Sequence, residues 1–114
     1  MDGEWLMEKF EIFITCISWR SGKKKRPVLV LLINDGCILV YPITTQYENK
    51  SKAIRARYYK MTDWMQSGLD KQSYIDTGTL LKLPLSVIAN KKPIGKLTLA
   101  EKQKLLKFLN KSNF

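Results

Sequence analysis

Short apolar segments separated by polar stretches predict a small domain built mainly from β-strands. Residues 10–19 are mostly β-branched or aromatic and alternate with a period of two, which indicates a strand buried on most of both faces. The same signals predict strands over residues 53–61, where one face is basic, over residues 73–83, where Gly78 marks a bulge, and over residues 94–97. Strands at this spacing are typical of a small barrel or sandwich.

The clearest pattern is a hairpin in the first half of the chain. Two apolar runs, residues 28–33 and 37–43, flank the turn Asn34-Asp35-Gly36. An Asp-Gly pair tolerates positive φ and favours tight two-residue connections. Pairing of the runs would bring Arg26, before the first run, and Thr44, after the second, to the same end of the sheet.

Helical signals lie in the middle and at the end of the chain. Residues 62–68 could form one turn with Thr62 as N-cap and Gly68 as stop, and residues 84–90 a turn with a short 3₁₀ piece. Thr98-Leu-Ala-Glu101 is a capping-box pattern that opens a C-terminal helix. We expect an apolar stripe toward the core and lysines toward water or a partner, namely Leu105, Leu106, Phe108 and Leu109, and Lys102, Lys104, Lys107 and Lys111.

The composition is that of one globular domain. The chain has 114 residues, of which 45% are hydrophobic and 26% are charged, and this length allows one core but not two. We expect a single domain over residues 1–114, with its core over residues 10–110. No stretch reaches the roughly 18 apolar residues that cross a membrane. The acidic N-terminus does not resemble a signal peptide, so we expect a cytoplasmic protein.

The residue types present exclude several kinds of site. The sequence has no histidine, and its two cysteines, Cys16 and Cys37, lie in apolar strand-like runs. We interpret both as small buried side chains, with a disulfide or a catalytic thiol as the alternative. The absence of histidine argues against a zinc site and removes Ser-His and Cys-His pairs. We expect no metal and no other cofactor.

The charge of the chain favours a polyanionic partner. Twenty Lys+Arg against ten Asp+Glu give a net charge of +10, and such a field attracts nucleic acid, acidic protein segments or anionic lipid. A basic loop over residues 20–25 could neutralise phosphates, and nearby aromatic rings could stack on unpaired bases. A solvated loop and buried rings are the alternatives. The candidate nucleic-acid-binding residues are Trp19, Arg20, Lys23, Lys24, Lys25, Thr45, Gln46, Arg55 and Arg57.

A site without histidine or metal can still cleave RNA through the 2′-hydroxyl of the RNA itself. The protein must then stabilise a charged phosphorane and move protons. The guanidinium of Arg26 matches phosphate oxygens and stays charged. The hydroxyl of Thr44 can hydrogen-bond the same phosphate, and the carboxylate of Asp76 could take a proton. These three are candidate catalytic residues, although their spacing alone does not establish the set.

Several segments resemble the MazF/PemK-type toxins, which are the mRNA endonucleases of bacterial toxin–antitoxin pairs. The resemblance spans residues 10–110 and is with the PemK-like branch of Gram-positive relatives. Arg-Pro at a strand start, Pro-x-Thr at the end of the next strand and Ile-Gly-Lys-Leu before the final helix make it specific. The matching segments are, in order, KRPVLVL (25–31), PITTQ (42–46), DW (63–64), GL (68–69), SYID (73–76) and IGKL (94–97).

The resemblance implies a fold, a reaction and partners. The fold would be mainly β with a C-terminal helix, an SH3-like small β-barrel. The protein would be a homodimer whose groove binds single-stranded RNA and also an acidic antitoxin. The reaction would be sequence-specific mRNA cleavage by the 2′-hydroxyl, leaving a cyclic phosphate without metal. By motif match, Arg26 and Thr44 stand for the catalytic arginine and threonine of the family. Asp76 falls near an acid/base aspartate, and the arginine that some members place two residues earlier is Tyr74 here.

Two other functions remain open from the residues. The same barrel could bind RNA or DNA without cutting it, or it could present its basic face to an acidic protein. Cleavage in EDTA that depends on Arg26 would favour the endoribonuclease. Salt-sensitive binding without turnover would favour the binding module, and a function indifferent to Thr44→Ala would favour the protein-interaction domain.

Overall fold

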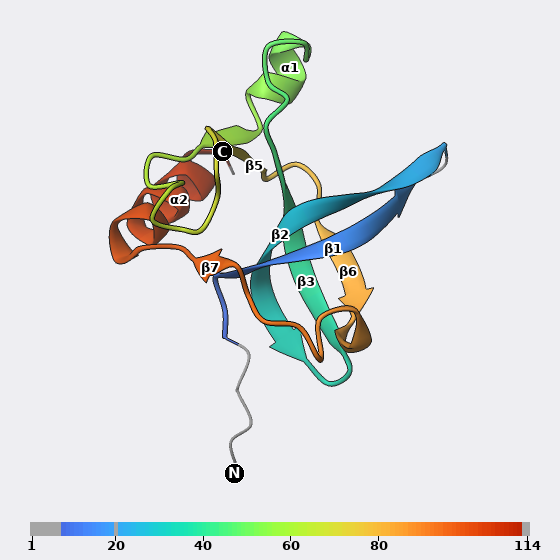
Figure 1. The fold of residues 1–114 in the computed structure, drawn as a ribbon. Helices are drawn as coiled ribbons and strands as arrows, with labels where there is room; N and C mark the ends of the chain where they lie inside the picture. Colours follow the sequence, from blue (N-terminus) through green and yellow to red (C-terminus); the bar gives the residue numbers. More distant parts are fainter. Residues whose placement is uncertain (1–7, 20, 113–114) are drawn as a thin grey trace.

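The fold is mainly β with one long C-terminal helix, as the sequence predicts. The structure is a computed structural model and describes residues 8–19 and 21–112. Figure 1 shows the arrangement of the elements within these residues. They are, in chain order, β1 (Glu11–Trp19), β2 (Gly22–Asn34), β3 (Cys37–Thr44), α1 (Lys52–Arg55), β4 (Tyr58–Lys60), β5 (Tyr74–Asp76), β6 (Leu81–Pro84), the 3₁₀ helix η1 (Leu85–Val87), β7 (Gly95–Lys96) and α2 (Leu99–Ser112).

The strands form one curled antiparallel sheet around β2 and β3. The strand order is β4-β5-β3-β2-β1-β7, with β6 paired to β3 as well. The first half of β3 pairs with β6, whereas its end, Ile43–Thr44, pairs with β5. A register shift between Val30 and Leu32 interrupts the pairing of β2 with β3, and such irregularities increase local twist. The sheet thereby curls into a half-barrel.

The hairpin predicted from the Asp-Gly turn is confirmed. Asn34 pairs with Cys37 across the two-residue turn, and Gly36 has a φ of 72°, the left-handed conformation that glycine adopts without steric cost. Val28 pairs with Pro42 near the other end of the same two strands. Arg26 and Thr44 therefore lie at one end of the sheet.

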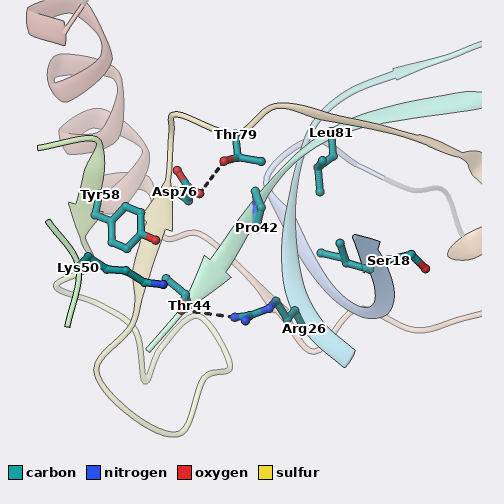
Figure 2. Close-up of a pocket in the computed structure, with 10 residues that line it drawn as sticks. Ser18, Arg26, Pro42, Thr44, Lys50, Tyr58, Asp76, Thr79 and Leu81 are labelled. Atoms are coloured by element: carbon teal, nitrogen blue, oxygen red, sulfur yellow. Dashed lines mark hydrogen bonds between the residues drawn. The ribbon is translucent and has the colours of Figure 1, made fainter. Parts of the chain in front are cut away.

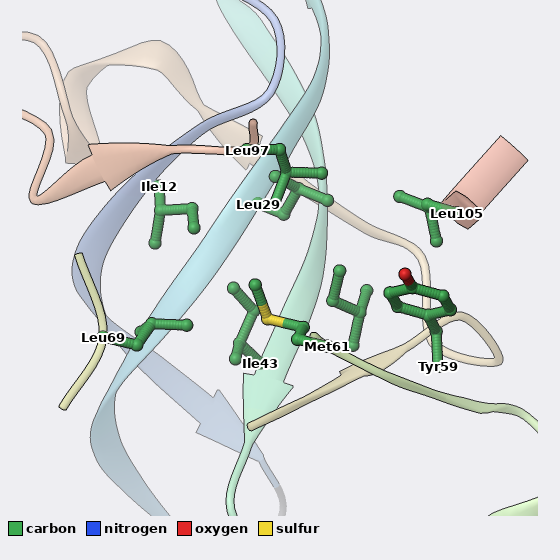
Figure 3. Packing of buried hydrophobic residues seen from close by; sticks show 9 residues of the cluster. Ile12, Leu29, Ile43, Tyr59, Met61, Leu69, Leu97 and Leu105 are labelled. Atoms are coloured by element: carbon green, nitrogen blue, oxygen red, sulfur yellow. The ribbon is translucent and has the colours of Figure 1, made fainter. Parts of the chain in front are cut away.

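The central strands are buried on both faces, because successive side chains point to opposite sides of a strand. One face carries Ile12 and Leu29 in the cluster under α2 that Figure 3 shows. The other carries Phe13 and Val28 in a second cluster, which Ile88 closes after η1. Both clusters exclude water from the strands that carry the site residues.

The predicted basic loop at residues 20–25 is wrong, because most of it is strand. β2 begins at Gly22, and Lys23, Lys24 and Lys25 pair with Ser18, Ile17 and Cys16. The paired ends of β1 and β2, residues 16–19 and 22–25, project beyond the sheet in Figure 1; we name them the β1–β2 arm. Pro27 is consequently inside β2. Pro27 lies just before the part of β2 that pairs with β3, which begins at Val28, so its missing N–H removes no hydrogen bond to β3.

Two other predicted strands are wrong in part. Residues 52–55 form the short helix α1 instead of a strand, because the Ser51 side chain accepts the N–H of Ile54 as an N-cap. Of the strand predicted over residues 53–61, only β4 is a strand in the structure. Residues 73–83 form two strands, since β5 and β6 pair with different parts of β3 and a turn at Thr77 and Gly78 separates them.

The turn before β5 and its glycine stop follow the prediction, but the Thr62 side chain is not the predicted N-cap, because it donates to Glu101 Oε2 and accepts from Lys104. The N–H of Ser67 donates to the carbonyl oxygen of Asp63 at 3.0 Å, which closes one helical turn. Gly68 ends it with a φ of 95°. A Cβ at Gly68 would also lie 2.2 Å from the carbonyl oxygen of Ile94, so both conformation and space require glycine there.

The C-terminal helix is capped as predicted, but two of its side chains are not where the pattern places them. The N–H of Glu101 donates to Thr98 Oγ1 at 3.1 Å, which confirms Thr98 as the cap. Glu101 itself is fully buried and bonds to the Thr62 and Asp63 N–H groups. Leu106 is 50% exposed, so the apolar stripe is narrower than predicted.

The cysteine prediction is wrong for Cys16. Cys16 is exposed in the β1–β2 arm and Cys37 is half-buried, and both are free thiols. The error follows from the arm, which carries the second half of β1 out of the core. Separately, none of the helices in residues 8–19 and 21–112 has the length and apolar character of a membrane crossing.

Candidate functional site

Arg26 and Thr44 meet at the end of the β2–β3 hairpin. Nη1 of Arg26 donates to Oγ1 of Thr44 at 3.4 Å, and the N–H of Gln46 donates to the same oxygen at 3.0 Å. Thr44 is the last residue of β3 and only 8% exposed. Two donors thus occupy the acceptor positions of the hydroxyl oxygen, so its own hydrogen is left to donate to another group.

A cavity of 240 Å³ opens beside this pair, and we name it the main cavity (Figure 2). Strands β1 to β6 and the loops after β3 and before β6 all contribute to it. Its lining residues are Ile17, Ser18, Arg26, Pro42, Thr44, Lys50, Tyr58, Asp76, Thr79 and Leu81.

The structure brings Asp76 to the same cavity. Its Oδ1 accepts the N–H of Gly78 at 3.0 Å and its Oδ2 accepts the hydroxyl of Thr79 at 2.7 Å. A carboxylate has about four lone-pair sites, so Asp76 keeps the capacity to accept from a ligand. All three candidate catalytic residues therefore lie in the wall of one cavity, while their roles remain predictions.

A second cavity, of 150 Å³, lies on the other side of the Arg26–Thr44 pair. Arg26 and Thr44 line both cavities, so the pair forms the ridge between them. A chain of nucleotides crossing the ridge would place one phosphate against the guanidinium. The lining residues of the second cavity are Lys24, Lys25, Arg26, Pro27, Ile43, Thr44, Thr45 and Ser73.

The predicted RNA-binding residues divide into those at the cavities and those away from them. Lys24, Lys25 and Thr45 line the second cavity, and Lys23 is exposed next to them on the β1–β2 arm. Gln46 is exposed and bonds to Thr44 through its backbone. These residues can follow a polyanion along one edge of the sheet.

Of the remaining predicted binding residues, Arg55 and Arg57 line neither cavity. The Arg55 guanidinium lies 5.7 Å from the centre of the Tyr47 ring, in α1 rather than on a basic strand face. Arg57 is exposed, and its carbonyl oxygen accepts the Thr77 side chain and backbone N–H. The side chain of Trp19 and the whole of Arg20 lie outside the described residues.

Tyr58 and Lys50 line the main cavity and were not among the predicted site residues. Tyr58 stands opposite Asp76 in the pairing of β4 with β5. Burial and the charge of Asp76 raise the pKa of Tyr58, against smaller opposite effects of Arg57 and Arg26. The sequence carries no local signal for this position, since it depends on β4 pairing with β5 eighteen residues later.

Over residues 8–19 and 21–112, no group of three or more His, Cys, Asp and Glu side chains is placed to hold a metal ion. The side chains that line the main cavity offer a guanidinium, an amine, hydroxyls, a phenol and a carboxylate.

Comparison with known proteins supports the resemblance seen in the sequence at the level of the fold. No protein-family model matches the chain, and no curated protein matches it significantly. Among solved structures it is similar to the Mycobacterium tuberculosis toxin MazF-mt6, with a TM-score of 0.65 over 89% of this chain and 93% of that one, at 21% identity. The chain has a MazF-like fold. The predicted MazF-type barrel with a C-terminal helix is thus confirmed.

Proposed function

We propose that the protein is an endoribonuclease toxin that cleaves single-stranded mRNA without a metal ion. The RNA supplies its own nucleophile, the 2′-hydroxyl next to the cleaved phosphate. The observation that carries this proposal is the Arg26–Thr44 pair, which forms the ridge between two cavities. The similarity of the fold to a MazF toxin and the net charge of +10 support it.

Arg26 is the group that stabilises the phosphorane. It is half-buried, and the contact with Thr44 holds its guanidinium at the ridge. A guanidinium placed before the reaction costs no reorganisation when charge develops on the phosphate oxygens. Thr44 donates its hydroxyl hydrogen to a phosphate oxygen, because its oxygen already accepts from Arg26 and Gln46.

Asp76 takes the proton of the attacking 2′-hydroxyl. Its two hydrogen bonds, from Gly78 and Thr79, fix the carboxylate at the cavity wall. An ionised carboxylate within reach of the 2′-oxygen is a suitable general base. Proton removal and phosphorane stabilisation then come from opposite walls of one cavity.

The charge distribution fits an extended RNA ligand and an acidic regulator. Lys23, Lys24 and Lys25 continue the basic surface from the second cavity along the β1–β2 arm. An acidic antitoxin segment would bind the same surface and block it. We further propose that the protein acts as a cytoplasmic homodimer and that the arm and the loop after β3 select the RNA sequence.

The test is cleavage of end-labelled single-stranded RNA of mixed sequence in EDTA. We expect discrete fragments ending in a cyclic phosphate, and we expect Arg26→Ala to abolish them. Lys107→Ala is the matched control, since it removes one positive charge from an exposed position on α2. Absence of cleavage by the wild-type protein, or equal cleavage by Arg26→Ala, would overturn the proposal; binding without cleavage would identify an RNA-binding module.

A further inference from the structure

The main cavity contains a phenol that the proposed mechanism has not used. The ring of Tyr58 enters from β4, and Figure 2 shows its hydroxyl directed into the space between Asp76 and Thr44. Arg26 lies on the other side of the cavity in this view. A ligand phosphate at Arg26 would therefore face the Tyr58 hydroxyl.

We propose that Tyr58 is a catalytic residue that donates the proton to the 5′-oxygen leaving group. This inference rests on the proposed endoribonuclease function. It names the general acid, for which the mechanism above has no residue. Cleavage expels an alkoxide, which is a far stronger base than a tyrosinate, so proton transfer from Tyr58 is downhill. A positioned general acid of this kind contributes typically about 10²–10⁴-fold to a rate.

The other side chains of the cavity are less suited to this role. An arginine does not release its proton in proteins, and the Thr79 hydroxyl is already donated to Asp76. Asp76 is needed as the base. The Ser18 hydroxyl also lines the cavity, but it is a far weaker acid than a phenol. Lys50 is acidic enough, but its ammonium lies at the end of a flexible four-carbon chain on a loop.

Tyr58, in contrast, is held by neighbouring rings. Tyr47 and Tyr74 stack with 4.3 Å between ring centres and an angle of 10°. The ring of Tyr58 packs at a tilt against both, at 6.2 Å and 6.5 Å. A catalytic group whose ring is fixed by packing holds its geometry better than one on a loop.

The state of the Tyr58 hydroxyl agrees with this role. Burial, and then the charge of Asp76, raise the pKa of Tyr58 above its usual value, while Arg57 and Arg26 lower it less. The phenol is therefore protonated at neutral pH and can act as a donor.

The proton and electron balance of the step closes within the cavity. The 2′-oxygen forms a bond to phosphorus and loses its proton to Asp76. The bond from phosphorus to the 5′-oxygen breaks, its electron pair stays on that oxygen, and the proton of Tyr58 neutralises it. Exchange of protons with water then removes the proton from Asp76 and returns one to the tyrosinate, which restores both groups. The products are a cyclic phosphate and a 5′-hydroxyl.

The test uses two versions of one RNA, with either oxygen or sulfur as the 5′ leaving atom at the bond that the wild-type protein cuts. A thiolate leaves without protonation, so the sulfur RNA needs no acid. We expect Tyr58→Phe to cut the oxygen RNA about 10²–10⁴-fold more slowly and the sulfur RNA at nearly the wild-type rate. Phenylalanine keeps the ring packing, and a thermal melt would check the fold.

Two controls separate a proton donor from a structural residue. Arg26→Ala should be slow on both RNAs, because phosphorane stabilisation is needed for either leaving group. Lys50→Gln should show no rescue by sulfur. Equal losses of Tyr58→Phe on both RNAs, no loss at all, or sulfur rescue of Lys50→Gln would overturn the inference while leaving the proposed function in place. Failure of the wild-type protein to cut either RNA would overturn the proposed function, and this inference with it.

Discussion

Arg26 and Thr44 are 18 residues apart in the sequence, yet the Arg26 guanidinium donates directly to the Thr44 hydroxyl oxygen at 3.4 Å. The hairpin of β2 and β3 creates this contact by pairing Val28 with Pro42 just inside the two residues. The same oxygen accepts the backbone N–H of Gln46. The contact therefore fixes the guanidinium and also sets the direction in which Thr44 can donate.

Substitutions at Thr44 test this arrangement. We expect Thr44→Val to lower the cleavage rate by about 10²–10³-fold, because a well-placed hydrogen-bond donor to a developing charge is worth that much. Thr44→Ser keeps the hydroxyl and should stay within about tenfold of the wild type. Rates under single-turnover conditions would measure both, and a valine variant as active as the serine variant would contradict the donor role.

The sequence predicts the hairpin well, because it rests on local signals, namely the Asp35-Gly36 turn and the apolar runs on either side. The local pattern does not give the exact partner of Arg26. A register shift between Val30 and Leu32 is needed to bring Val28 opposite Pro42, and so Arg26 beside Thr44. The Thr98 cap is likewise local, since its partner is three residues away.

The features that the sequence missed depend on contacts between distant segments. Glu101 has the spacing of a capping box, but Tyr59 and the backbone of Thr62 and Asp63 bind its carboxylate. Tyr58 reaches the main cavity because β4 pairs with β5. Single-sequence patterns carry no signal for either partner. The lysines of the β1–β2 arm were predicted as a loop because their charges conceal a strand pairing.

The lysines of the arm should govern the salt dependence of RNA binding. For single-stranded nucleic acid, every phosphate that a protein neutralises adds about 0.7 to the slope of log affinity against log salt. Replacing Lys23, Lys24 and Lys25 by glutamine should therefore reduce the slope by about 2. A 2′-O-methyl RNA, which cannot be cleaved by its own hydroxyl, allows this measurement by fluorescence anisotropy.

The control for this prediction removes the same charge from another surface. Lys104, Lys107 and Lys111 are exposed on α2, and their replacement by glutamine should leave the slope unchanged. Equal effects of the two triple variants would show that the protein attracts RNA through net charge alone, and would contradict a binding path along the arm.

Glu101 should contribute strongly to stability. It is fully buried and accepts from Tyr59 and from the N–H groups of Thr62 and Asp63, which joins α2 to the segment after β4. Glu101→Ala leaves these donors without an acceptor, at about 1–3 kcal/mol each, so we expect the free energy of unfolding to fall by about 3 kcal/mol or more. Urea denaturation would measure the change.

Two variants of the same helix calibrate that result. Glu101→Gln keeps one acceptor oxygen, and its loss should be smaller, about 1 kcal/mol. Gln103→Ala changes an exposed side chain on α2 and should stay within about 0.5 kcal/mol of the wild type. A Glu101→Ala protein as stable as Gln103→Ala would show that the buried carboxylate does not support the fold.

Tyr59 should make the protein less stable in alkali. Burial, the hydrogen bond to Glu101, and the charges of Glu101 and Asp63 raise the pKa of Tyr59 above its usual value of 10.0. Above pH 10 the unfolded chain releases this proton while the folded protein keeps it, so the unfolded state binds fewer protons and stability falls as pH rises. The stabilisation that comes from the raised pKa of Tyr59 is fully present below pH 10.

Between pH 7.5 and 10.5, urea denaturation should therefore show a larger loss of stability for the wild type than for Tyr59→Phe, which lacks the titrating group. Other groups with altered pKa values, such as Tyr58 and Tyr41, are common to both proteins and cancel in the difference. Parallel pH profiles for the two proteins would contradict the prediction.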